Sequence, residues 1–208
     1  MTTTARVALL GNPNTGKTTV FNRLCGARAK TANFPGTTTS ARVGRAKVGG
    51  DLTLELLDLP GIYELGLQSP EAGIVRDVLS ETDEAHRPDT VLVIVDASNL
   101  SRNLVLVGEV LSRGFKPIIC LNMIDVAARR GWTIDAAALA RQLGVPVVPT
   151  VAPKGIGLDQ LRATLLESLN GHRAEPPAPV DNRYDPVVIA EAVIKGRPAG
   201  EPVSDALT

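Results

Sequence analysis

The stretch Gly11-Asn12-Pro13-Asn14-Thr15-Gly16-Lys17-Thr18 is the part of this sequence around which the rest can be interpreted. It satisfies the pattern G-x-x-x-x-G-K-[ST], between the apolar run of residues 7–10 and the helix-like residues 19–24. In such a loop the backbone N–H groups turn toward an anion, and the following helix directs its positive end to the same point. The pattern therefore predicts a phosphate-binding loop, in which Lys17 reaches the β- and γ-phosphates and Thr18 gives its hydroxyl to Mg²⁺. A glycine turn that matches by chance is the alternative.

The composition predicts one domain of ordinary size with a hydrophobic core. Of the 208 residues, 44% are apolar, and Lys plus Arg and Asp plus Glu both number 22. The net charge of zero gives no overall field that would favour nucleic acid or anionic lipid. Because no apolar run is long enough to cross a bilayer, we expect no direct membrane insertion. The balanced charge leads us to expect no nucleic-acid partner. The two cysteines are typical of a reduced, cytoplasmic protein. Cys25 and Cys120 lack metal-ligand spacing, so we expect them to be buried thiols.

Short apolar runs alternate with helical patterns along the chain. Continuously apolar strands are typical of a sheet that is covered on both faces, which indicates an α/β fold with mostly parallel strands. Residues 42–57 read as a hairpin, the source of one antiparallel edge strand. Residues 133–143, opened by Thr133, read as a short helix that buries Ile134, Ala138 and Leu139. The expected strands are residues 6–10, 42–48, 52–57, 91–95, 117–121 and 145–149.

The character of the sequence changes after residue 170. We expect a first domain over residues 1–170, a proline-rich linker over 171–184, and a short helix with a disordered tail over 185–208. Asp185 and Pro186 are typical of a helix start, and Lys195-Gly196 of its end. A helix this short is not stable alone. It therefore packs back on the domain, belongs to a partner surface, or begins a helical domain that the chain does not finish.

Two further motifs follow strands, at the edge where α/β folds bind ligands. The first, Asn122-Met123-Ile124-Asp125, comes directly after an apolar strand. Asp125 can accept hydrogen bonds from the N1–H and the exocyclic amine of guanine, a pair that adenine lacks, while Asn122 would hold the neighbouring loop and the N7 edge of the base. Residues 151–155, VAPKG, could close over the base. The alternative interpretation of the first motif is an ordinary helix N-cap.

The second motif, Asp58-Leu59-Pro60-Gly61, also follows a strand. Asp58 can hold a water of the Mg²⁺ shell, and Gly61 can donate its N–H to a γ-phosphate, although a simple Pro-Gly turn would read the same way. Between the first helix and the second strand, residues 31–40 form a polar loop with too many breakers for regular structure. A threonine there could complete the Mg²⁺ shell only when the γ-phosphate is present, and Thr37, Thr38 and Thr39 all compete for that role.

Together these motifs resemble a GTPase of the translation-factor-related class and, more narrowly, the N-terminal G domain of the ferrous-iron transporter B (FeoB) family. The resemblance runs over residues 5 to about 170. Phosphate loop and DLPG are shared by many GTPases, whereas residues 96–104, DASNLSRNL, and the methionine within NMID are typical of this family. The motifs that carry the resemblance are GNPNTGKTTVFN (11–22), NFPGTT (33–38), DLPGIY (58–63), VDASNL (95–100) with RNL (102–104), and NMID (122–125).

The resemblance implies a P-loop GTPase, a three-layer sandwich with a six-stranded sheet and, here, an additional C-terminal helix. Alignment of the Pro-Gly-x-Thr pattern makes Thr38 the switch I threonine. Related GTPases with an asparagine at the place of Asn14 use bound K⁺ as a fixed positive charge, which implies the same role here. Ile62 stands where Ras-like enzymes carry a water-orienting glutamine, so we expect slow intrinsic hydrolysis that K⁺ stimulates.

These expectations define the candidate site. The catalytic candidates are Asn14, Lys17, Thr38 and Gly61, with Thr18, Thr38 and (through water) Asp58 on Mg²⁺ and Asn14 on K⁺. The candidates for binding GTP or GDP are Asn12, Asn14, Thr15, Gly16, Lys17, Thr18, Thr19, Gly36, Thr37, Thr38, Asp58, Gly61, Asn122, Met123, Asp125, Val151, Ala152 and Pro153.

Two departures qualify the site, one from the family pattern and one from the pattern of the wider class. The family has a Ser-Ala-type sequence where this chain has Val151-Ala152-Pro153, so a serine hydroxyl that supports the base loop is missing. Met123 replaces the lysine of the wider class with a thioether. The implied function is a GTPase domain that couples its switch segments to a membrane permease outside this chain, at the cytoplasmic face of a bacterial inner membrane. The alternatives are a stand-alone RNA- or ribosome-associated GTPase and a scaffold that binds nucleotide without turnover.

Overall fold

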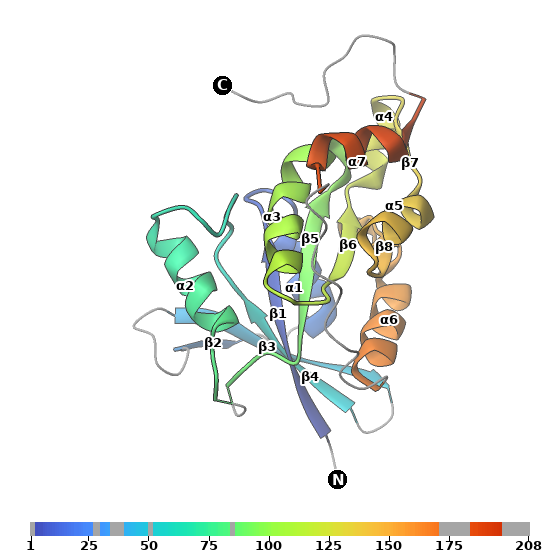
Figure 1. Ribbon diagram of the computed structural model, residues 1–208. Helices are drawn as coiled ribbons and strands as arrows, with labels where there is room; N and C mark the ends of the chain where they lie inside the picture. The colour runs from blue at the N-terminus through green and yellow to red at the C-terminus, as the bar shows by residue number, and fades with distance from the viewer. Residues whose placement is uncertain are drawn as a thin grey trace.

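The apolar run before the phosphate-loop pattern forms the central strand of a seven-stranded sheet in the computed structural model of the chain (Figure 1). The structure describes residues 3–26, 30–33, 40–49, 52–83, 86–170 and 184–196. The order of the strands is β2-β3-β4-β1-β5-β6-β8, and all neighbours from β4 to β8 are parallel. The strands are β1 (Thr3–Gly11), β2 (Lys30–Asn33), β3 (Ser40–Gly49), β4 (Leu52–Asp58), β5 (Thr90–Asp96), β6 (Ile118–Asn122) and β8 (Val147–Pro149).

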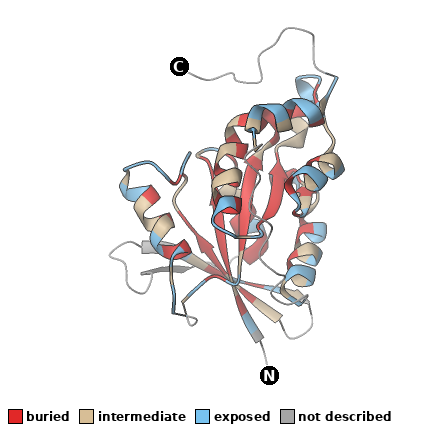
Figure 2. Cartoon of the chain, in the orientation of Figure 1, coloured by how far each residue is buried: buried red, intermediate tan, exposed pale blue. Residues whose placement is uncertain are grey.

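Helices cover both faces of this sheet. Leu10, Val93 and Leu121 belong to the core on one face, and their chain neighbours Leu9 and Ile94 belong to the core on the other. Because successive side chains of a strand point to opposite faces, a sheet covered twice needs continuously apolar strands, as the sequence indicated. Figure 2 shows the central strands as the most continuously buried part of the chain. The helices are α1 (Lys17–Cys25), α2 (Pro70–Leu79), α3 (Leu100–Ser112), α4 (Ile124–Arg129), α5 (Ala136–Leu143), α6 (Leu158–Asn170) and α7 (Pro186–Val193).

The expected α/β architecture, with a mostly parallel sheet and one antiparallel strand, is confirmed. Strand β3 runs antiparallel to both of its neighbours, β4 and β2. The structure differs in adding β2 outside β3, where the sequence indicated an irregular loop over residues 31–40. The physical reason is that residues 30–33 precede the breakers Pro35 and Gly36, and a short strand at a sheet edge needs only backbone pairing with its neighbour. The antiparallel strand therefore lies one place inside the edge.

The helix expected over residues 133–143 begins later than the sequence indicated. Thr133 and Ile134 form strand β7, which pairs with strand β9 (Ile194–Lys195), and α5 starts only after them. Asp135 is the residue that caps α5, because its carboxylate accepts the N–H of Ala138 at 2.9 Å. Ala138 and Leu139 still pack in the core, whereas Ile134 reaches it from β7. The expectation that Thr133 opens the helix is wrong.

The helix after the proline-rich segment packs back on the domain. Asp185 caps α7 as expected, accepting the N–H of Val187 at 2.8 Å, and Val193 is fully buried against the core that α3 and α5 share. Tyr184, which precedes the cap, donates its hydroxyl to the carbonyl of Leu104 in α3 at 2.6 Å. Burial raises the pKa of the Tyr184 hydroxyl above its ordinary value. Of the alternatives that the sequence left open for this helix, the structure shows packing on the domain.

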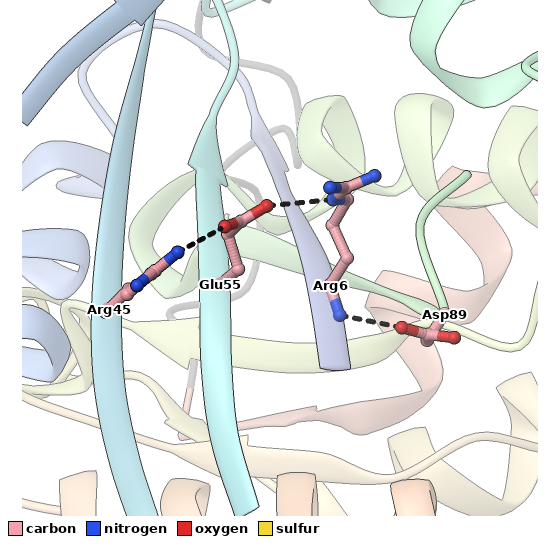
Figure 3. Close-up of polar contacts among 4 residues, drawn as sticks. All are labelled: Arg6, Arg45, Glu55 and Asp89. Atoms are coloured by element: carbon pink, nitrogen blue, oxygen red, sulfur yellow. Dashed lines mark hydrogen bonds and ion pairs between the residues drawn. The ribbon is translucent and has the colours of Figure 1, made fainter. Parts of the chain in front are cut away.

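A row of charged side chains crosses the sheet near the N-terminal end of β1, away from the phosphate loop (Figure 3). Glu55 of β4 lies opposite Arg6 of β1 and Arg45 of β3 in the strand register, and its carboxylate pairs with both, at 3.0 and 3.6 Å. The carboxylate of Asp89 accepts the backbone N–H of Arg6 at 2.7 Å. Such cross-strand pairs between opposite charges favour the observed register. Among the described residues, no helix is both long enough and apolar enough to span a membrane.

Candidate functional site

The phosphate-loop pattern forms a turn between β1 and α1 that leaves the start of the helix open. Asn14 and Gly16 adopt left-handed backbone conformations, with φ of 66° and 82°. Gly16 occupies the N-cap position of α1 and has no side chain to cap the first N–H groups. A Cβ atom at Gly16 would lie 2.5 Å from Nδ2 of Asn122, so this position requires glycine for space as well as for conformation. The first turn of α1 therefore presents uncapped N–H groups at the carboxyl edge of the sheet.

The side chains of the loop divide between buried and exposed. The side chain of Asn12 is only 3% exposed, and its amide nitrogen and oxygen lack a hydrogen-bond partner among the described residues. The Asn12 carbonyl accepts the hydroxyl of Thr15 at 3.0 Å, which closes the loop on itself. Asn14 and Thr18 are exposed, and Thr19 is half-buried. The exposed pair is thus accessible to a ligand or an ion at the mouth of the loop.

Asn122 joins the phosphate loop to the loop over residues 150–152. Its side chain is fully buried, and its Nδ2 donates to the carbonyl of Thr15 at 2.9 Å. Its Oδ1 accepts the N–H of Ala152 at 3.0 Å and the hydroxyl of Thr150 at 3.2 Å. The part of the prediction in which Asn122 holds neighbouring loops agrees with these bonds. Thr150 was not singled out from the sequence, because nothing in its local pattern signals a partner 28 residues away.

Asp58 and the DLPG segment lie directly against the phosphate loop. The ammonium of Lys17 forms an ion pair with the Asp58 carboxylate, which is 9% exposed at the end of β4. Further along, Ile62 donates its N–H to the carbonyl of Gly11 at 3.2 Å. A Cβ atom at Gly61 would lie 3.2 Å from the backbone of Pro13, so this close approach favours glycine. Two motifs whose contacting residues, Lys17 and Asp58, are 41 positions apart in the sequence are thereby brought together at one edge.

Asp125 lies after β6 in the first turn of α4, beside two basic side chains. Arg129 donates to its Oδ2 at 3.2 Å, and the ammonium of Lys154 lies 3.5 Å from the same oxygen. Partial burial opposes ionisation of this carboxyl, but the hydrogen bonds and charges of Arg129 and Lys154 outweigh it and lower the pKa of Asp125. Met123 has a left-handed backbone conformation, with φ of 62°, which turns the chain from β6 into α4. The carboxylate is therefore ionised and partly exposed at this edge.

The segment expected to close over a base forms a 3₁₀ turn, η3 (Ala152–Lys154), after β8. Val151 and Ala152 are buried, and Pro153 is exposed. The guanidinium of Arg23, in the last turn of α1, donates to the carbonyl of Pro153, and Arg162 of α6 donates to the carbonyl of Arg23 at 2.8 Å. Sequence reasoning missed Arg23, because the motif around Lys17 gives no sign of contact with residues 151–155. The turn is thus tied to the helix that carries the phosphate loop.

The stretch DASNL after β5 has a structural role that its sequence did not reveal. The N–H and hydroxyl of Ser98 both donate to the carboxylate of Asp96 at 2.8 Å. Asn103 accepts the N–H of Asp96 at 3.2 Å and donates to the carbonyl of Asn99 at 2.8 Å. These bonds fix the turn η2 (Ala97–Asn99) between β5 and α3. The remaining candidates Gly36, Thr37 and Thr38 lie outside the described residues.

Comparison with known proteins identifies the family. A family model described as "Ferrous iron transport protein B" matches residues 5–165, which is most of the chain. The chain belongs to this family. The expected identity as an N-terminal FeoB G domain, a domain of the GTPase fold, is thereby confirmed.

The FeoB relatives are much longer than this chain. The chain is 43% identical over 183 residues to an Fe(2+) transport protein A/Fe(2+) transporter FeoB fusion protein of Porphyromonas gingivalis, which covers 88% of this chain and 21% of the relative. It is 38% identical over 159 residues to the Fe(2+) transporter FeoB of Salmonella typhimurium, covering 76% of this chain and 20% of the relative. The chain therefore spans about a fifth of the curated relatives it matches.

Solved FeoB domains have the same fold. An S. thermophilus NFeoB mutant bound to GDP is 40% identical, with a TM-score of 0.73, and covers 84% of this chain and 65% of that chain. The FeoB G-domain from Methanococcus jannaschii is 35% identical, with a TM-score of 0.68, and covers 80% of this chain and 98% of that chain.

Proposed function

We propose that this FeoB G domain binds GTP and GDP and hydrolyses GTP slowly, as the cytoplasmic regulatory domain of a ferrous-iron transport system. The observation that carries the proposal is the convergence of three motifs at one edge of the sheet. Asn122 forms hydrogen bonds with Thr15 of the phosphate loop and with Ala152 of the segment 151–155, which is expected to close over the base. Lys17 forms an ion pair with Asp58 of the DLPG segment. The carboxyl edge of a mostly parallel sheet is where such folds bind nucleotides. GDP in a similar S. thermophilus NFeoB structure supports the choice of nucleotide.

The phosphates would bind at the open end of α1. The uncapped N–H groups that follow Gly16 are donors for an anion, and the helix dipole adds to their attraction. Lys17 would exchange its present partner, the Asp58 carboxylate, for the β- and γ-phosphates. Gly61, which lies on Pro13, would donate its N–H to the γ-phosphate. In this scheme the DLPG segment senses which nucleotide is bound, because only GTP offers that contact.

The residues of the edge also fit two cations. Thr18 offers an exposed hydroxyl and Asp58 a carboxylate, which are oxygen donors of the kind that Mg²⁺ accepts, Asp58 through a water. Thr38 would complete this set. The exposed amide of Asn14 would hold K⁺ at the mouth of the loop. When bound, the two cations supply positive charge beside the phosphate oxygens.

Slow hydrolysis follows from the position of Ile62. Its side chain is 3% exposed and belongs to the core that α2 and α3 share, so it does not orient a water. The base would be read by Asp125, with Asn122 and Met123 beside it and residues 151–153 above it. The curated relatives are Fe(2+) transporters of which this chain spans about a fifth, and a similar solved structure is a cytosolic domain of L. pneumophila FeoB. These observations support the proposal that the domain works at the cytoplasmic face of the inner membrane. Its switch segments would couple to the permease portion there.

The test is GTP turnover in K⁺ and in Na⁺ for the wild type, Asn14→Ala and the control Asn22→Ala. We expect the wild-type rate to be at least about tenfold higher in K⁺, because a fixed cation near the phosphates lowers the barrier. Asn14→Ala should remove most of this difference. Asn22 lies on the exposed side of α1 beside Arg42, so its variant should keep the wild-type ratio. Equal wild-type rates in the two salts would contradict the potassium assignment, and no turnover in either would contradict the GTPase assignment.

A further inference from the structure

The segment after the DLPG motif is held by side chains of two helices. Residues 62–69 form neither helix nor strand. Glu109 of α3 accepts the backbone N–H groups of Leu65 and Gly66, the latter at 3.3 Å. Arg76 of α2 donates to the carbonyls of Leu65 and Leu67, the latter at 2.8 Å. Four backbone groups of three consecutive residues are thus bound by two charged side chains.

A third charged side chain, that of Arg102, contacts this segment closer to the phosphate loop. The guanidinium of Arg102 lies over the ring of Tyr63, 4.1 Å from its centroid, within the range of a cation–π interaction. Arg102 and Glu109 are seven residues apart, about two turns, so they occupy the same side of α3. Arg102 belongs to the family-typical stretch DASNLSRNL, which gives that stretch a contact with the segment after Gly61.

The segment is short between its two fixed points. At its start, Gly61 lies on Pro13 and Ile62 donates to the carbonyl of Gly11 at 3.2 Å. At its end, Leu65 is fully buried and its N–H is bound by Glu109. Only residues 62–64 separate Gly61 from Leu65. Because each residue has only two freely rotating backbone dihedrals, this short stretch can absorb little of a displacement of Leu65, so Gly61 would shift as well.

We propose that Glu109 is a positioning residue for GTP hydrolysis, which it serves by anchoring Leu65 and Gly66 so that Gly61 is held at the γ-phosphate position. This inference rests on the proposed function. Glu109 does not touch the nucleotide in this scheme; it acts through the backbone of the DLPG segment. Its effect therefore depends on whether the nucleotide has a γ-phosphate.

The chemistry of Glu109 suits this task. A carboxylate is an acceptor with two oxygens, and it can receive two consecutive N–H groups in charge-assisted hydrogen bonds. A glutamine in its place has one acceptor oxygen, and its amide NH₂ would face the second N–H. The charge would be lost, and one backbone donor would be left without a good partner.

The helix that carries Glu109 is itself held by contacts on another side. The ring of Tyr184 lies against Gly108, where a Cβ atom would come within 2.4 Å of Cε1. The Tyr184 hydroxyl donates to the carbonyl of Leu104. Figure 1 shows α7 lying across α3 above the sheet. Glu109 is consequently held relative to the core, so it can serve as an anchor for the segment after Gly61.

The test compares nucleotide affinities of the wild type and Glu109→Gln, using GDP and the slowly hydrolysed analogue GTPγS, together with the turnover number for GTP. In Glu109→Gln we expect the dissociation constant of GTPγS to rise about tenfold and kcat for GTP to fall about tenfold. The dissociation constant of GDP should change by less than about twofold. Arg76→Met keeps a long side chain but removes the hydrogen bonds to the carbonyls of Leu65 and Leu67. It should change the ratio of the two affinities in the same direction.

The matched control is Glu167→Gln, an identical change at an exposed position of α6, which should leave both affinities and kcat at their wild-type values. Equal losses for GDP and GTPγS in Glu109→Gln would show a stabilising role alone and overturn the inference, as would no change in either. If the wild type binds neither nucleotide, the proposed function fails and the inference with it. If the wild type turns over GTP and Glu109→Gln behaves like it, only the inference fails.

Discussion

Asn122 shows how one buried amide can hold a site together. A fully buried asparagine is destabilising unless its donors and acceptor are satisfied, and here three hydrogen bonds join residues from three parts of the chain. Asp125, three residues later, instead keeps a partly exposed carboxylate between two cations. The first residue therefore fixes the loops, and the second is accessible for recognition of a ligand.

The base specificity of Asp125 can be tested with Asp125→Asn. A carboxylate accepts both N1–H and the exocyclic amine of guanine, whereas an amide can donate to the carbonyl that xanthine has in place of that amine. We expect the preference to shift from GDP toward xanthosine diphosphate by roughly tenfold to a hundredfold, since one bidentate pair discriminates by about 1–3 kcal/mol. Competition binding of the two nucleotides measures this shift.

The control for this change is Asp159→Asn in α6. Asp159 also forms an ion pair with an arginine of its own helix, Arg162, at 3.0 Å, but its side chain is fully exposed. The control variant should keep the wild-type preference for guanine. If Asp125→Asn keeps it as well, the residue that reads the base lies elsewhere at this edge.

At the level of single residues, the sequence indicated where several candidate residues lie in the fold but not which residues contact them. The pattern around Lys17 and the placement of NMID after a strand indicated which residues gather at the sheet edge, because the carboxyl ends of parallel strands meet there. The contacts of Arg23 with Pro153 and of Glu109 with Leu65 join residues 130 and 44 positions apart. No local spacing rule covers such pairs, so only the folded chain reveals them.

At the scale of elements, long apolar runs predicted strands well, whereas short strands that depend on pairing with a neighbour left no signal. Residues 7–10 of β1 and 91–95 of β5 are continuously apolar, and these two strands end within one residue of the expected bounds. Strand β1 begins earlier than expected, at Thr3, because its first residues are polar. The two-residue strands β7 and β9 have no periodicity to detect, and they exist because α7 returns to the domain. The edge strand β2 likewise depends on the neighbouring β3.

The packing of the C-terminal element can be tested with Gly108→Ala in α3. The new methyl group would lie 2.4 Å from Tyr184 Cε1, so the ring must move and its contact with α3 is disturbed. Overpacking costs about 1–3 kcal/mol, which exceeds the gain of about 1 kcal/mol in helix propensity. We therefore expect a lower free energy of unfolding in urea.

Gly73→Ala in α2 is the matched control. There the nearest atom to a new methyl group is the Arg76 guanidinium at 3.9 Å, so the change adds helix propensity without a clash. We expect this variant to be more stable than the wild type by about 0.5–1 kcal/mol. If Gly108→Ala were stabilised to the same degree, Tyr184 would not be seated on α3.

At the scale of the whole molecule, the two ends of the sheet have different tasks. The carboxyl edge collects Lys17, Asp58, Asn122 and Asp125 at the ends of strands and the starts of helices. Near the other end of the sheet, the Arg6–Glu55–Arg45 row favours the observed register of three strands (Figure 3). Between them lie two apolar cores, one on each face. The apolar strands predicted that both faces of the sheet are covered. Because these two cores supply the apolar packing, the loops of the site can be polar.

The burial of the Cys120 thiol in β6 predicts how the free energy of unfolding depends on pH. Cys120 is fully buried between the sheet and the helices of one face, and burial raises its pKa from 9.0 to about 12. Between these two values the folded chain keeps the proton and the unfolded chain has released it, so stability must fall as pH rises above about 9.

The test compares the wild type with Cys120→Ala, in which Thr150 keeps its hydrogen bond to Asn122. The other groups that titrate in this pH range are present in both proteins, so their effects cancel in the comparison. The difference between the two urea unfolding curves, measured from pH 8 to 10.5, should therefore isolate the thiol. We expect the wild type to lose up to about 1.4 kcal/mol more per pH unit than the variant above pH 9. Parallel curves would mean that the Cys120 thiol ionises as easily in the folded chain as in the unfolded one.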